Sequence, residues 1–445
     1  MNSTNKKKAG RFFPALVIGC VALLAGCDAL TGFFGGEEEV CPPENHPEDG
    51  LNPSVLSFYV SSTGDDTNNE GTDEAAPLAT LAVAYEKALL DKTRRRIVVL
   101  TDLVEEELVT LPPNGITTNV KGAFVLIEGK SAGLKIERSV GANDSVLQIQ
   151  GGAKVAFKNI TVNGKIAPND DSENANNRAI LVTGNGTEVV LGAGAVATGK
   201  MYSGDVNIDS DKHGIGIRVI NGGKLVMAAG SAVTDCEGVQ SVNGAIQLSN
   251  GFLEMKYGSR VYGNTARFGG GVQAYNDSAV TMYGGEISGN RATQGGGGIH
   301  LQYNSAFTML GGEIIGNEAI GYGGGIGTGN QCAVTIKGGK ITGNRSEKGG
   351  GGVEVFKTAF TMAGGEIGGN TTDEDGGGVY LSNDNTTVFT MTGGVVYGAD
   401  VPVPQGNTVD AGAGKTGAAL YKSADAVIKD TPSVTDTTET TIDMR

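Results

Sequence analysis

One phrase repeats through the middle of the chain, and its period constrains the fold more than any other feature. It reads Val280-Thr-Met-Tyr-Gly-Gly-Glu-Ile-Ser-Gly-Asn290 and then Phe307-Thr-Met-Leu-Gly-Gly-Glu-Ile-Ile-Gly-Asn317. Each copy ends on an asparagine, 26 or 27 residues after the previous one: Asn264, Asn290, Asn317, Asn344 and Asn370. Self-similarity at such a period is typical of stacked units, each packed on its neighbours.

Short strands must build each unit, because glycines interrupt the sequence too often for an amphipathic helix of ten or more residues. Three apolar alternations recur in every unit. In one unit they are Val280 with Met282, then Ile287, then Ile299 with Leu301. This pattern predicts three strands per coil.

Equivalent apolar residues recur at the same register, so like side chains are expected to stack on one another. One such column reads Leu253, Val280, Phe307, Val334, Phe360 and Phe389. The 73 glycines fit the corners of a coil, where a positive φ or a close backbone approach favours a residue without Cβ. We therefore predict an all-β fold, a right-handed parallel β-helix of about eleven or twelve three-stranded coils. The repeated asparagines are interpreted as a structural ladder, since amides one strand spacing (~4.8 Å) apart can hydrogen-bond along the stack.

The N-terminus has the pattern of a bacterial export signal. Basic residues between Lys6 and Arg11 precede an apolar stretch at 14–25, which ends in Leu24-Ala25-Gly26-Cys27. The residues before Cys27 resemble the lipobox of bacterial lipoproteins. That resemblance implies acylation of Cys27, with palmitate or a similar chain, and a lipid-anchored protein of the cell envelope, expected in the outer membrane and exposed at the surface.

Composition divides the chain into five predicted segments. Apolar residues at helical spacing between 75 and 91 indicate one amphipathic helix that covers the open N-terminal end of the stack. The segments are the signal peptide (1–26), the lipidated cysteine and flexible tether (27–53), the initial strand and capping helix (54–96), the β-helix (97–430) and a C-terminal tail (431–445).

The formal charge of −15 makes the chain acidic. An acidic surface without a basic patch disfavours nucleic acid as a partner. We expect a monomer that contacts the membrane through the lipid on Cys27 and that binds a host protein or a glycan.

Two further patterns point to known families. The sequences Gly270-Gly271-Val272 and Gly297-Gly298-Ile299, combined with Ile-x-Gly-Asn, resemble the repeats of the polymorphic outer-membrane protein family, whose members are bacterial surface adhesins. The segment around Phe58-Tyr59-Val60-Ser61 resembles the beginning of many extracellular right-handed β-helix proteins, pectate-lyase-like ones included. These resemblances imply an adhesin-like role toward host or envelope ligands.

Residues on the outward side of the third strand form the preferred ligand-binding face, because aromatic and amide side chains suit stacking on sugars or packing against a protein. They are Gln273, Tyr275, His300, Gln302, Glu354, Phe356 and Tyr380. A plain solvent face with scattered aromatics is the competing interpretation. The outward positions of this strand show no carboxylate pair, and the stacked Glu286 and Glu313 of the second strand are interpreted as part of a stabilising charged column. No catalytic residue is therefore predicted, and we expect a protein that is not an enzyme.

Two longer acidic loops, at 164–177 and 200–213, form the alternative site. Stacking would gather several carboxylates there: Asp170, Asp171, Asp205, Asp209 and Asp211. Such a group can bind Ca²⁺ or act in a polysaccharide lyase or glycoside hydrolase, although the loops can equally be solvated acidic segments. No other cofactor is expected. A third hypothesis is a structural envelope protein without a specific ligand.

Overall fold

The computed structural model describes most of the chain from residue 56 onward. The described residues are 56–91, 93–112, 124–138, 145–164, 177–198, 214–238, 244–398, 406–409, 420–422, 427–429 and 443–444.

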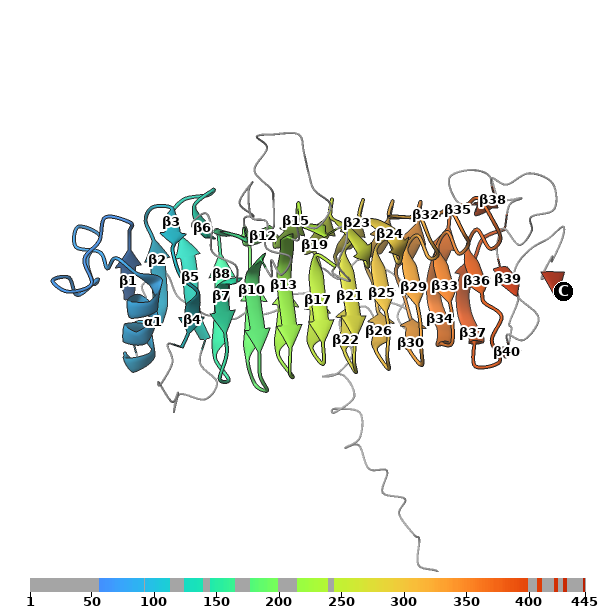
Figure 1. Ribbon diagram of the computed structural model, residues 1–445, viewed down its shortest axis with the longest axis horizontal. Helices are drawn as coiled ribbons and strands as arrows, with labels where there is room; N and C mark the ends of the chain where they lie inside the picture. Colours follow the sequence, from blue (N-terminus) through green and yellow to red (C-terminus); the bar gives the residue numbers. More distant parts are fainter. Residues whose placement is uncertain are drawn as a thin grey trace, which may run out of the picture. The chain divides into compact units, whose positions relative to one another are not determined.

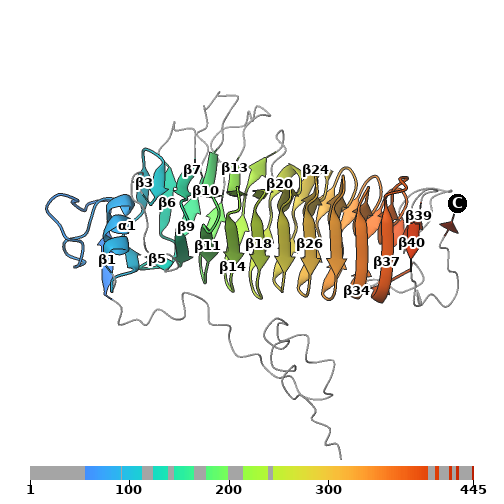
Figure 2. The same cartoon turned by 90° about the horizontal axis from the view of Figure 1, so that it is seen from below.

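The strands form four ladders, in each of which a strand pairs in parallel with its equivalent in the next coil. Each ladder extends in chain order (Figures 1 and 2). The first ladder contains β1 (Ser57–Val60), β2 (Arg96–Val99), β5 (Phe124–Gly129), β8 (Lys154–Lys158), β11 (Glu188–Leu191), β14 (Lys224–Met227), β18 (Phe252–Met255), β22 (Ala279–Met282), β26 (Ala306–Met309), β30 (Ala333–Ile336), β34 (Ala359–Gly368), β37 (Val388–Val396) and β40 (Val427–Lys429).

The second ladder belongs to the same 22-stranded sheet as the first, because β34 and β37 are long strands that contribute to both ladders through the bend that separates the two ladders. Its remaining strands are β3 (Leu103–Glu105), β6 (Lys135–Arg138), β9 (Thr161–Asn163), β12 (Val196–Thr198), β15 (Ala232–Thr234), β19 (Arg260–Tyr262), β23 (Glu286–Ser288), β27 (Glu313–Ile315) and β31 (Lys340–Thr342).

The third ladder is a 12-stranded sheet. It contains β4 (Val109–Leu111), β7 (Ser145–Ile149), β10 (Asn177–Thr183), β13 (Gly214–Ile220), β17 (Ile246–Ser249), β21 (Val272–Tyr275), β25 (Ile299–Leu301), β29 (Ile326–Thr328), β33 (Val353–Val355), β36 (Val379–Leu381), β39 (Leu420–Lys422) and β41 (Asp443–Met444).

A fourth, 7-stranded ladder follows the repeated asparagines, and its presence corrects the prediction of three strands per coil. Its members are β16 (Glu237–Gly238), β20 (Thr265–Phe268), β24 (Arg291–Gly295), β28 (Glu318–Ala319), β32 (Arg345–Ser346), β35 (Thr371–Thr372) and β38 (Thr408–Val409). These strands are short, and several bury a single small side chain, such as Ala266 in β20 and Ala319 in β28, so they lack the apolar alternation by which strands are predicted.

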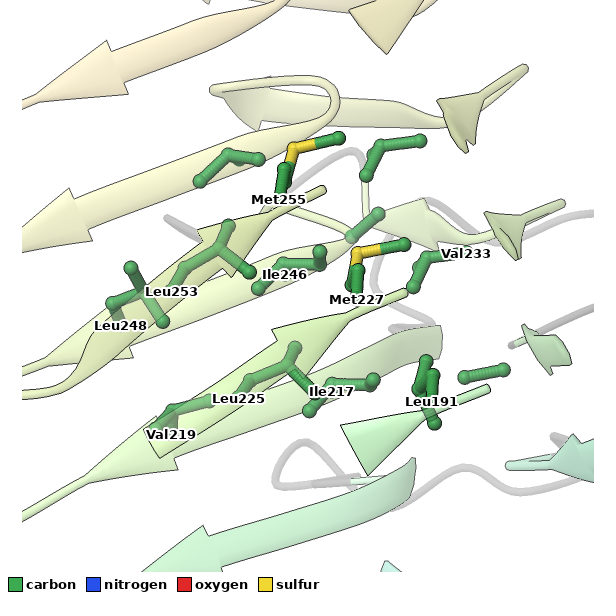
Figure 3. Packing of buried hydrophobic residues seen from close by; sticks show 14 of the residues in the cluster. Leu191, Ile217, Val219, Leu225, Met227, Val233, Ile246, Leu248, Leu253 and Met255 are labelled. Carbon is green, nitrogen blue, oxygen red and sulfur yellow. The ribbon is translucent and has the colours of Figure 1, made fainter. Parts of the chain in front are cut away.

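The core is the inside of the coil. Register places Val280 on Phe307 and Met282 on Met309, as the repeat predicts, and all four side chains are buried. Figure 3 shows the same stacking in earlier coils, with Leu225 beneath Leu253 and Met227 beneath Met255. The all-β parallel β-helix predicted from the sequence is confirmed.

One helix, α1 (Leu81–Leu90), lies at the β1 end of the stack (Figure 1). The Thr80 side chain caps it by accepting a hydrogen bond from the Val83 N–H at 3.4 Å. The apolar face of α1, which includes Leu81 and Tyr85, is fully buried in the core. The helix therefore covers the first coils, as predicted.

The repeated asparagines form a buried ladder between the second and fourth ladders of strands. The Asn317 Nδ2 group donates to Asn344 Oδ1 at 2.9 Å and to the Ile287 carbonyl oxygen at 2.9 Å. Asn370 continues the chain of bonds to Asn407, 37 residues later, where the spacing of the sequence repeat has already broken down.

Candidate functional site

The outward side of the third ladder is covered by five backbone segments that we term the glycine arms. They lead from the fourth ladder to the third and comprise residues 268–271, 295–298, 322–325, 349–352 and 375–378. A Cβ added at Gly296 would lie 2.7 Å from the His300 Cβ, and one added at Gly327 would lie 2.7 Å from the Gly296 nitrogen. Glycine is thus required because the arm backbone rests directly on the strand.

This cover corrects the predicted ligand-binding face. Gln273, His300 and Glu354 retain only 0%, 6% and 8% of their accessible surface, so they are buried rather than open to solvent. The other four predicted residues of the face are half-buried: Tyr275, Gln302, Phe356 and Tyr380. The seven residues therefore do not form one open surface.

Three tyrosines on this side, which we term the tyrosine row, have rings in contact: Tyr322, Tyr380 and Tyr421. Tyr380 and Tyr421 are partners on adjacent strands β36 and β39, and their rings stack at 5.2 Å with an interplanar angle of 2°. Tyr322 belongs to a glycine arm and is 40% exposed, and its ring centroid lies 5.8 Å from that of Tyr380. Figure 1 shows β29, β33, β36 and β39 in succession along this part of the stack.

Glu354 lies beneath the tyrosine row. Its Cα is the strand partner of Tyr380, and the preceding coil has Gly327 at the equivalent position, so no side chain fills that place. Its Oε2 accepts a hydrogen bond from the Thr328 N–H at 3.0 Å. Burial raises the pKa of Glu354 to about 8, although this hydrogen bond opposes the shift, so the carboxyl group is neutral at pH 7.

Two more carboxylates, those of Glu374 and Asp375, lie in the turn before β36. Burial raises the pKa of Tyr322, and the charges of Glu374 and Glu354 raise it further. Burial also raises the pKa of Tyr380 to about 12, with smaller contributions from the neighbouring tyrosines and carboxylates, including Asp375. Tyr322 and Tyr380 are therefore uncharged at physiological pH and lie among acids.

A second group of buried polar side chains consists of Gln273 and His300, which lie three and two coils before Glu354. Gln273 is the strand partner of His300, and both atoms of its amide, as well as His300 Nδ1, have no hydrogen-bond partner among the described residues. Phe268 packs on the imidazole with a centroid distance of 4.7 Å. Burial lowers the pKa of His300 to about 4, so this side chain is neutral.

Several predicted sites lie outside the described residues. They are Cys27 and the five aspartates Asp170, Asp171, Asp205, Asp209 and Asp211. Within the residues that the structure describes, no group of three or more His, Cys, Asp or Glu side chains is arranged to hold a metal ion. In that same part of the chain, no helix has the length and apolar character needed to cross a bilayer.

A scan against models of protein families finds no match, and neither does a search of curated proteins. Among solved structures, the chain is similar to a GH136 lacto-N-biosidase from Eubacterium ramulus at 12% identity and a TM-score of 0.33. The match covers 84% of this chain and 67% of that one.

Sequence reasoning found one member of the tyrosine row, Tyr380, and missed Tyr322 and Tyr421. Tyr322 stands in the glycine run Gly321-Tyr-Gly-Gly-Gly325, where no strand period applies, and Tyr421 follows a long interruption of the repeat. One signal in the sequence could have identified Tyr322, because an aromatic residue within a corner glycine run is exposed to solvent unless another element covers it.

Proposed function

We propose that this chain is a lipid-anchored protein of the bacterial envelope whose β-helix binds a saccharide chain across the tyrosine row. The observation that carries this proposal is the alignment of Tyr322, Tyr380 and Tyr421 along the stack on one side of it, with ring contacts of 5.8 and 5.2 Å.

A saccharide suits this surface for two reasons. The C–H groups of a sugar ring can pack against the exposed ring of Tyr322, while the phenol hydroxyls of the row and the surrounding carboxyl groups match the sugar hydroxyls. A row that runs along the stack also offers repeated contacts to a repeated ligand, which a chain of sugar units supplies. The arrangement is less suited to an anionic partner, because Glu374 and Asp375 border it.

The lipid anchor would determine where the protein acts. A lipid on Cys27 would hold the β-helix at the envelope, and the saccharide could belong either to a host surface or to the envelope itself, which is an adhesin-like role. Cleavage of a polysaccharide at the acidic loops, with or without Ca²⁺, remains a separate proposal and is tested by loss of product release in a D209N/D211N variant.

Saccharide binding is tested with the full chain, purified in detergent, on an array of neutral and acidic oligosaccharides. We expect binding to a set of neutral oligosaccharides, and a loss of affinity of about tenfold or more in Tyr322→Ser, since removal of one stacked ring costs roughly 1.4 kcal/mol or more.

The matched control is Tyr257→Ser. Tyr257 is 57% exposed but lies beside Gly284, next to the first ladder and away from the tyrosine row. The Tyr257→Ser variant should bind like the unmodified chain. Equal binding by the Tyr322 variant and the unmodified chain, or no binding to any saccharide, would refute the proposal.

A further inference from the structure

Glu354 differs in environment from every other carboxyl group in the described part of the chain. It is the one Asp or Glu there that belongs to the buried class, at 8% exposure. Two cations on neighbouring segments are engaged with other acids, Arg345 with Asp373 at 2.7 Å and Lys357 with Asp384 at 3.8 Å. A carboxyl group buried without a cation is strongly favoured in its neutral form.

We propose that Glu354 recognises the ligand of the tyrosine row as a hydrogen-bond donor, through the hydroxyl of its neutral carboxyl group. The inference rests on the proposed saccharide function and names the ligand class more closely. The partner atom would be a hydroxyl or ether oxygen of an uncharged saccharide, and not an amino or carboxylate group.

The two carboxyl oxygens of Glu354 have different hydrogen-bonding roles. Oε2 accepts the hydrogen bond of the Thr328 N–H, which leaves Oε1 to carry the proton. The Thr328 hydroxyl donates in turn to the Glu354 backbone oxygen at 3.1 Å, and the Phe356 N–H donates to that hydroxyl at 3.0 Å. The side chain is therefore held by the backbone of the preceding coil in a fixed position.

The tyrosine row places a ligand near that proton. Tyr322 reaches from its arm to Tyr380, two coils further on, and Glu354 stands on the coil between them. Both tyrosines interact electrostatically with the Glu354 carboxyl group. A sugar that packs against the Tyr322 ring and the edge of Tyr380 would thus lie over the Glu354 side chain, where water is largely excluded and a hydrogen bond is strengthened.

The test uses two substitutions that separate a donor from an acceptor. Glu354→Gln retains an N–H donor of similar size and should bind the array-selected neutral oligosaccharide within about threefold of the unmodified chain at pH 7. Glu354→Ala removes the donor and should bind about tenfold more weakly. Glu313→Gln, which changes an exposed acid on β27 in the second ladder, is the matched control and should bind normally.

The pH profile gives a second readout. Because the pKa of Glu354 is raised to about 8, its proton is present at pH 7 and is lost as the pH rises through 8. The affinity of the unmodified chain should fall by about tenfold between pH 7 and 9.5, whereas that of Glu354→Gln should change much less. Other ionisable groups that interact with this site are Tyr322, Tyr380, Glu374 and Asp375, and they are common to both proteins.

Three results would overturn the inference: an affinity of Glu354→Gln as low as that of Glu354→Ala, an affinity of Glu354→Ala equal to that of the unmodified chain, or identical pH profiles for the unmodified chain and Glu354→Gln. Circular dichroism at each pH verifies that the variants are folded. If the Tyr322→Ser variant loses affinity while the Glu354 variants do not, this inference fails and the proposed function stands. If the unmodified chain binds no saccharide, both fail.

Discussion

At the scale of single residues, Asn317 shows how one side chain joins three coils. Its Nδ2 group donates to Ile287 and Asn344, while its Oδ1 accepts from the backbone N–H and the Nδ2 group of Asn290 at 3.0 and 2.9 Å. All of these atoms belong to buried residues. Removal of the amide would leave several buried polar groups unpaired, and each costs about 1–3 kcal/mol.

We therefore expect Asn317→Ala to lower the free energy of unfolding by roughly 3 kcal/mol. Urea denaturation followed by circular dichroism measures this change. Gln294→Ala, which removes an exposed amide in β24, should change it by less than about 0.5 kcal/mol. A loss below about 1 kcal/mol for the Asn317 variant would show that the ladder does not stabilise the stack.

Residue columns explain which features the sequence predicts well. Asn264 to Asn370 recur at a constant spacing, so their stacking follows from the period alone. Glu354 recurs in no column, because its equivalents are His300 and Gly327. Its burial depends on an arm that folds back over the strand, and a contact of that kind leaves no periodic signal.

At the scale of elements, the glycine arms determine what the third ladder can present. Successive arms hydrogen-bond to one another, as in the bond from the Gly323 N–H to the Gly349 oxygen at 3.0 Å. Sequence reasoning correctly assigned these glycines to corners, but a corner was expected to leave the strand open. The arm backbone covers part of the strand instead, so arm side chains such as Tyr322 contribute to the exposed surface beside half-buried strand residues such as Tyr380.

Close packing of the arms predicts unequal costs for two glycine substitutions. A Cβ at Gly324 would lie 2.4 Å from both the Arg345 and the Gly351 oxygens, whereas Gly316 has φ +64° and nothing within 4 Å of an added Cβ. Gly324→Ala should lower stability by roughly 3 kcal/mol through overpacking, and Gly316→Ala by about 1 kcal/mol through backbone strain.

Urea denaturation of both variants, each compared with the unmodified chain, measures the difference. Similar losses for the two would contradict the close approach of the arm at Gly324 to the coil that follows it.

At the scale of the whole molecule, the period of 26 or 27 residues predicts the fold because every coil must bury its apolar columns against the next. The same regularity limits functional inference. Structural residues recur, whereas a binding site is built where the repeat changes, and the tyrosine row lies near the C-terminal coils where the spacing lengthens from 26 to 37 residues. The acidic loops interrupt the repeat in the same way and are the other place where function is expected.

The most direct test is binding of the array-selected neutral oligosaccharide, fluorescently labelled, to intact bacteria that express the full chain. We predict saturable labelling of intact cells, a loss of about tenfold in affinity with Tyr322→Ser, and transfer of the binding activity from the cells to the medium or periplasm with Cys27→Ala. Equal labelling of cells that express the unmodified chain and cells that express Tyr322→Ser would contradict a saccharide site at the tyrosine row. Labelling that requires permeabilised cells would contradict display at the surface.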